Sequence, residues 1–191
     1  MLKEIHESPL VIEKSLKDRI QLREGTITSK LLLAIRDTNF ERVEFIGSGT
    51  SHHAGLLASY WIEQLSELDT RCTVASEFFE KIPRIEKTTL FVLVSQSGET
   101  ADLIGPLKYL EEHGANTFGV VNVENSTIAK MSKNCLFVRA GTEIGVASTK
   151  AFTAQITVLL VMSLFFSVQS STDFRRYREI LQGLEVLPNL A

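Results

Sequence analysis

A cluster of polar side chains follows directly after a short apolar stretch near the middle of the sequence. The stretch is Leu90–Val94, and the side chains after it include Ser95, Gln96, Ser97 and Thr100. Leucines at helical spacing come next. Amide groups at a helix N-terminus have no partner within the helix, so with the helix dipole they bind phosphate without a cationic residue. The sequence therefore predicts an anion site here, with Ser95, Ser97 and Thr100 as phosphate ligands.

This turn differs from the loops that hold nucleoside triphosphates. It contains one glycine, Gly98, and it lacks the Gly-Lys-Ser/Thr ending of such loops. The pattern favours a small phosphomonoester as the ligand. The alternative is that the serines and the threonine only cap the following helix.

Two further polar turns stand between a strand-like run and a helical pattern. The first contains Thr50 and Ser51, which are candidates for the same ligand. A dinucleotide site is disfavoured there, because no third glycine follows and no acidic residue clearly ends the next strand. The second turn, 141–150, contains Glu143 and Ser148. Glu143 could act as a general base near a sugar carbon, or it could pair with Lys150.

Five strand-like runs alternate with helical patterns along the chain. They are Val43–Gly47, Arg71–Ala75, Leu90–Val94, Asn116–Asn122 and Cys135–Val138. Such alternation predicts a three-layer α/β/α fold with a five-stranded parallel sheet of flavodoxin-like type. Ligands of these folds bind beyond the carboxyl ends of the strands, so the three polar turns are expected to converge on one pocket.

The whole chain, 1–191, is expected to form a single domain. A helical segment would occupy 1–40, the sheet core 41–170 and a C-terminal helix 171–191. Ser8 and Pro9 are expected to begin a first helix whose inner face carries Ile12, Leu16 and Ile20. A second helix is expected from about Thr28 to Asp37.

Composition excludes several classes of protein. The net charge of −3 gives no electrostatic support for nucleic-acid binding. Cys72 and Cys135 lie in strand-like runs without metal-ligand spacing, which is typical of buried thiols in a reducing compartment. We expect a cytoplasmic protein, because the N-terminus has no apolar signal segment. The apolar run Ile156–Val168 is too short to cross a membrane and favours a buried helix.

Three motifs resemble the SIS (sugar isomerase) domain family. They are Gly49–Ser51, Ser95–Asp102 and Gly141–Thr153. The resemblance is closest to the first of two such domains in the isomerase half of the glutamine–fructose-6-phosphate aminotransferase (glucosamine-6-phosphate synthase) family. It covers about residues 1–170, and Lys3–Pro9 resembles the start of that isomerase half.

The resemblance implies a site for a hexose or hexosamine 6-phosphate, such as fructose 6-phosphate or glucosamine 6-phosphate. It assigns the phosphate to Ser51, Ser95, Ser97 and Thr100, and the sugar to Thr50, Gln96, Val146 and Ser148. It implies no metal and no organic cofactor. It also implies a covering surface, either a second copy in a homodimer or a second SIS lobe.

The sequence departs from that family in ways that leave three functions open. The family has a glutaminase domain before this region and a second SIS domain after it, which carries the catalytic residues, so the catalytic residues are unassigned here. The favoured function is the phosphosugar-binding part of such an enzyme. A self-contained homo-oligomeric isomerase would have to use Glu143, His52 or His53. The third function is a sugar-phosphate sensor without catalysis.

Overall fold

The computed structural model describes residues 1–21, 26–29, 32, 35, 38–145, 147–169 and 174–191. Five parallel strands form the central sheet, in the order β4-β3-β5-β6-β7. They are β3 (Arg42–Gly47), β4 (Asp69–Val74), β5 (Thr89–Ser95), β6 (Asn116–Val121) and β7 (Asn134–Phe137). The predicted α/β fold is confirmed, and each predicted strand is present with its ends shifted by at most two residues.

The central strand β5 is buried along its whole length, as its unbroken apolar run predicts. Alternate side chains of the sheet point to opposite faces and form two separate cores. Phe45 and Val92 belong to one core, whereas Ile46 and Phe91 belong to the other.

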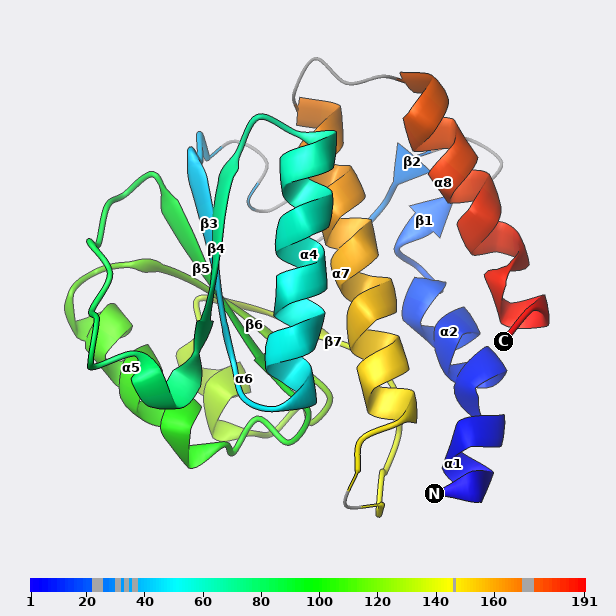
Figure 1. Cartoon of the computed structure of the whole chain (residues 1–191), viewed down its shortest axis with the longest axis horizontal. Coiled ribbons are helices and arrows are strands. Elements are labelled where there is room, and N and C mark those ends of the chain that lie inside the picture. The colour runs from blue at the N-terminus through cyan, green and yellow to red at the C-terminus, as the bar shows by residue number, and fades with distance from the viewer. Residues whose placement is uncertain (22–25, 30–31, 33–34, 36–37, 146, 170–173) are drawn as a thin grey trace.

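Helices cover both faces of the sheet (Figure 1). On one face α4 (Thr50–Leu65) packs against α7 (Lys150–Gln169). The other face carries α5 (Ala101–Glu112), α6 (Thr127–Met131) and the short turn η1 (Ala75–Glu77). Beyond α7 lie α1 (Leu2–His6), α2 (Ser8–Leu16), α8 (Phe174–Val186) and η2 (Leu187–Asn189).

Helix α7 is apolar on all sides, because it packs against the sheet core and α4 inside and against α2 outside. Residues Lys150–Val168 are long and apolar enough to cross a membrane by composition alone. Of the most apolar 18-residue window in this span, 72% is buried inside the protein. Burial within the fold therefore explains the composition, as the sequence predicts for Ile156–Val168.

The N-terminal region differs from the prediction in two ways. Ser8 lies inside α2, and Glu7 occupies the position before the helix. Ile12 and Leu16 are buried as expected, but Ile20 lies in the strand β1 (Ile20–Gln21), which pairs with β2 (Thr26–Ile27) in an antiparallel hairpin. The helix expected over Thr28–Asp37 falls largely outside the described residues.

Candidate functional site

The chain changes direction across the sheet between β3 and β5. From β3 the chain goes on to the edge strand β4, whereas β5 leads the other way to β6 and β7. At such a switch point the two following turns separate and leave a crevice beyond the carboxyl ends of the strands. The turns after β3 and β5 are those with the predicted phosphate ligands. The register pairs Gly47 with Val94, so both turns leave the sheet at the same level.

Serine and threonine hydroxyls of the turn after β5 form hydrogen bonds within the turn itself. The Ser95 Oγ accepts a hydrogen bond from the Gly98 amide at 2.9 Å and lies 2.9 Å from the Thr100 Oγ1. The Ser97 Oγ accepts from the Glu99 amide at 3.1 Å, which leaves its own proton free to donate. Thr100 precedes α5 without a side-chain hydrogen bond to the helix, so no hydroxyl caps the first amides of α5.

The other side of this turn is fixed to α6. Gly98 has a φ of +67°, and a Cβ atom there would lie 2.0 Å from the Ser126 Oγ. The Glu99 Oε1 accepts the Thr127 amide at 2.7 Å, and hydrogen bonds from the Thr127 side chain and then from this amide lower the pKa of Glu99. The turn is therefore held at a fixed distance from the start of α6, with its polar groups at the end of β5.

The turn after β3 brings the strand end close to α4. A Cβ atom at Gly47 would lie 2.8 Å from the His52 amide nitrogen, and Gly49 has a φ of +56°. No side chain caps α4. Thr50 is exposed and Ser51 is buried, and the Ser51 Oγ lies 3.0 Å from Nε2 of the buried Gln155 on α7.

The third turn, between β7 and α7, uses Glu143 as a helix cap. Its Oε1 accepts from the amides of Thr149 at 2.9 Å and Ala151 at 3.2 Å, and its Oε2 accepts from the Ser148 hydroxyl at 2.9 Å. The predicted alternative, an ion pair between Glu143 and Lys150, is wrong, because the Lys150 ammonium pairs with Glu7. Val146 lies outside the described residues.

The two histidines stand at the start of α4, where His53 is exposed. The His52 Nδ1 lies 3.3 Å from the Cys72 Sγ, and burial lowers the pKa of His52. Burial raises the pKa of Cys72 and of Cys135 to about 12, so both free thiols are poor nucleophiles. Cys135 is buried, as predicted, whereas Cys72 is only half-buried.

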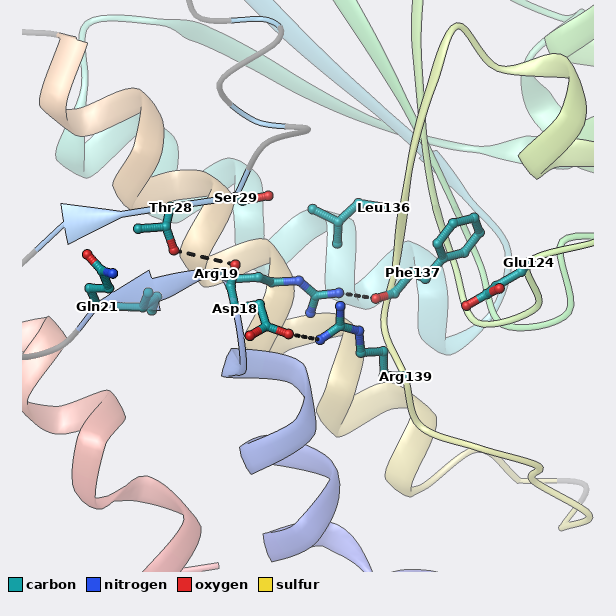
Figure 2. A pocket seen from close by; sticks show the side chains of 10 residues that line it. Asp18, Arg19, Gln21, Thr28, Ser29, Glu124, Leu136, Phe137 and Arg139 are labelled. Carbon is teal, nitrogen blue, oxygen red and sulfur yellow. Dashed lines mark hydrogen bonds and ion pairs between the residues drawn. The ribbon is translucent and has the colours of Figure 1, made fainter.

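Two cavities are present among the described residues, and the second of them reaches the start of α4 at His52. The first, of about 560 Å³, is lined by Arg19, Arg139 and residues of the hairpin and β7 (Figure 2). The Arg19 guanidinium donates to the carbonyls of Ser15 and Phe137, and Arg139 pairs with Asp18 at 3.5 Å. The second, of about 510 Å³, is lined by Glu44, His52 and the segment 81–84. Those predicted phosphate and sugar ligands that the structure describes line neither.

Sequence reasoning missed two side chains that fix these turns. Gln155 is a buried polar residue within an apolar helix, and that contrast is a signal that could have identified it. Asn122 follows β6, accepts the Ala140 amide at 2.8 Å and donates to the Gly141 carbonyl at 2.7 Å. Among the described residues, no group of three or more His, Cys, Asp or Glu side chains could hold a metal ion.

Comparison with known proteins identifies similar domains. The family model described as "SIS domain" matches residues 37–164. The glutamine–fructose-6-phosphate aminotransferase [isomerizing] of Chlamydia caviae is 41% identical over 192 aligned positions, covering 100% of this chain and 31% of the relative. The enzyme of that name from Thermus thermophilus is 37% identical, with the same coverage.

One solved structure is similar along the whole chain. It is the C-terminal domain of glucosamine-fructose-6-phosphate aminotransferase from Francisella tularensis, with a TM-score of 0.90 and 30% identity. It is matched over 100% of this chain and 54% of its own. The chain spans about a third of the length of the curated relatives it matches.

Proposed function

Since the chain belongs to the SIS domain family and is homologous to the isomerase portion of glutamine–fructose-6-phosphate aminotransferase, we propose that it binds a hexose or hexosamine 6-phosphate at the switch point between β3 and β5. The observation that carries this proposal is the placement of two hydroxyl-rich turns at neighbouring strand ends. Fructose 6-phosphate and glucosamine 6-phosphate are the favoured ligands, because the relatives' names specify fructose 6-phosphate and a glucosamine enzyme.

The phosphate binds to the turn after β5 and to the start of α4. The Ser97 hydroxyl donates to a phosphate oxygen, because its acceptor position is already used by the Glu99 amide. Ser95 and Thr100 bind the phosphate from the same turn, where their hydroxyls already lie 2.9 Å apart. The Ser51 hydroxyl contributes from α4. Uncapped amides of two helix N-termini supply the remaining donors without a cationic side chain.

The sugar extends from the phosphate toward the turn between β7 and α7. Thr50 and Gln96 contact it from the first two turns, and Val146 and Ser148 contact it from the third. The Ser148 hydroxyl donates to Glu143, so it is oriented to accept a hydrogen bond from a sugar hydroxyl. All the side chains proposed to contact the ligand are uncharged. They suit a sugar whose only charges are its phosphate and, in glucosamine 6-phosphate, its amine.

We assign no catalytic group for isomerisation among the described residues of the three turns. Glu143 is a candidate base, but its carboxylate already accepts hydrogen bonds from the start of α7. A second SIS lobe or a twin subunit of a homodimer supplies the base and covers the sugar. We place this domain in an isomerising aminotransferase-like enzyme of amino-sugar biosynthesis, working in the cytoplasm.

The test is calorimetric titration of the chain with fructose 6-phosphate, glucosamine 6-phosphate, and unphosphorylated glucose as the control. We expect binding of both phosphosugars and none of glucose. An absence of binding to every phosphosugar would overturn the proposal. Turnover of fructose 6-phosphate by the chain alone would favour the self-contained isomerase. Binding without turnover, together with a ligand-dependent protein partner, would favour the sensor.

A further inference from the structure

The helix α1 carries an inverted pattern of burial. Its leucine and isoleucine, Leu2 and Ile5, are 71% and 46% exposed, whereas the carboxylate residue Glu4 between them is 8% exposed. Removing a carboxylate from water is unfavourable unless hydrogen bonds replace its solvent contacts. The burial of Glu4 therefore calls for a group that holds it in place.

Two groups do so: the Met1 ammonium, which lies 2.9 Å from the Glu4 Oε2, and the polypeptide backbone of the turn between β7 and α7. The Glu4 Oε1 accepts hydrogen bonds from two successive amides, Ile144 at 2.6 Å and Gly145 at 3.0 Å. Successive amides that point to one side form a small anion-binding concavity. Glu4 and this concavity are separated by 140 residues of sequence, so the contact joins the N-terminal segment to the third polar turn.

Gly145 has a steric reason to be a glycine. A Cβ atom at this position would lie 2.7 Å from the Glu4 Oε2 and 3.4 Å from the Ala147 carbonyl oxygen. A side chain at this position would force the Glu4 carboxylate to shift from its place against the turn. The close approach of the Glu4 carboxylate to the backbone therefore depends both on Glu4 and on the absence of a side chain at Gly145.

A second carboxylate of the same segment holds the end of the turn. Glu7 pairs with the ammonium of Lys150, the first residue of α7, and Lys150 is 4% exposed. The turn from Gly141 to Thr149 is thus held at its start by Asn122, in its middle by Glu4 and at its end by Glu7.

We propose that Glu4 is a positioning residue of the sugar site, which holds the Ile144–Gly145 backbone and so fixes the turn that carries Ser148. The inference rests on the proposed function, because it assigns this turn to the sugar and the turn after β5 to the phosphate. Loss of the carboxylate releases the middle of the turn while leaving the β5 turn intact. Glu4 therefore acts on recognition of the sugar and not on recognition of the phosphate.

The experiment compares Glu4→Ala and Glu4→Gln with the matched control Glu13→Ala, which removes an exposed glutamate of α2. Hydrogen exchange is measured at the Ile144 and Gly145 amides, and binding of glucose 6-phosphate and of inorganic phosphate is measured by calorimetry. For Glu4→Ala we expect exchange about tenfold faster and glucose 6-phosphate binding about tenfold weaker, with phosphate binding changed less than about twofold. Glu4→Gln keeps one acceptor oxygen. Its amide exchange rates and its affinity for glucose 6-phosphate are therefore expected to lie between those of Glu4→Ala and those of the unaltered chain.

Gly145→Ala is the second variant, because it disturbs the contact without changing the carboxylate. It is expected to reproduce the selective loss of glucose 6-phosphate binding. Unchanged exchange at the two amides, or an equal loss of both ligands, would overturn the assignment of Glu4. If the unaltered chain binds neither these two ligands nor fructose 6-phosphate or glucosamine 6-phosphate, the proposed function fails. Faster exchange in Glu4→Ala would then identify Glu4 as an anchor of the fold alone.

Discussion

The Ser51 hydroxyl and the Gln155 side-chain amide are hydrogen-bonded across the boundary between α4 and α7, with Oγ and Nε2 3.0 Å apart. Both residues are buried, at 7% and 0% exposure. Ser51 is a proposed phosphate ligand in the first turn of α4, and Gln155 lies in the second turn of α7. This bond therefore fixes the orientation of one proposed ligand from a helix that begins 99 residues later in the sequence.

Replacing Gln155 by leucine keeps the volume but leaves the Ser51 hydroxyl buried without its partner. We expect the free energy of unfolding to fall by about 1–3 kcal/mol, the cost of an unsatisfied buried polar group. Urea denaturation measures this change. Gln182→Leu, at an exposed position of α8, is the control and should change stability by less than about 0.5 kcal/mol. Equal stability of Gln155→Leu and the unaltered chain would contradict the role of this bond.

Ser97→Ala tests the phosphate site directly. Removing the hydroxyl should weaken binding of glucose 6-phosphate by about 1–3 kcal/mol, because a hydrogen bond to a charged oxygen is lost. Calorimetry measures the change. The control Ser66→Ala alters a serine at the opposite end of α4 and should leave the affinity unchanged. An unchanged affinity in Ser97→Ala would remove this residue from the site.

Gly98→Ala and Gly114→Ala separate backbone strain from a steric clash. Both glycines have positive φ values, +67° and +71°, but an added Cβ meets Ser126 only at Gly98. A non-glycine residue in this region costs about 1–2 kcal/mol, so Gly114→Ala should lose about that much stability. Gly98→Ala should lose more and also weaken phosphosugar binding. Equal losses in thermal or urea unfolding would show that Ser126 moves aside without cost.

Glu44→Gln is expected to stabilise the protein near neutral pH. Burial raises the pKa of Glu44 despite the hydrogen bond from Thr73, so the folded state holds this proton more tightly than the unfolded state. Stability is therefore lost as the pH rises from the unfolded pKa through the folded pKa. The glutamine variant avoids that loss, and its advantage should disappear at low pH, where Glu44 is protonated in both states. Unfolding temperatures measured across pH test this, and a constant difference between the proteins would contradict it.

Glu143→Ala tests whether this residue serves the fold or the reaction. Its carboxylate accepts two amides at the start of α7, and losing such a cap costs about 0.5–2 kcal/mol of stability. We expect this loss in urea denaturation. We also expect no interconversion of fructose and glucose 6-phosphates by either protein alone. Turnover in the unaltered chain that disappears in Glu143→Gln would identify Glu143 as a base of a self-contained isomerase.

The fold could be predicted from the sequence because its signals are local. The central strand is a short apolar run followed within a few residues by serine and glycine, as in Leu90–Gly98, and the other strands except the more polar β4 follow a similar pattern. The same local pattern indicated which turns leave the carboxyl ends of strands. The five-stranded parallel sheet and the juxtaposition of the first two turns follow from that alternation and were confirmed.

Features that depend on distant residues could not be predicted. The spacing of Ile12, Leu16 and Ile20 continues a helical period, but Asp18 adopts a φ of +63° and the chain turns into a strand. Arg19 then donates to the Phe137 carbonyl, 118 residues away, and Asp18 pairs with Arg139. The partners of Gln155 and Lys150 are likewise fixed by packing between elements, whereas those of Glu143 lie only five to eight residues along the chain.

The contact of α2 with α7 also affects how the protein is made. On the ribosome, α2 is completed at Leu16 and the first residue of its partner is Lys150, so 134 residues (150 − 16) separate them. At typical rates of about 5–20 residues per second, α2 emerges roughly 7–27 s before the helix it packs against. During that interval the apolar side chains of Val11, Ile12 and Leu16 have no native partner on α7. A nascent-chain chaperone that binds short apolar helices would therefore find its target in the first sixteen residues.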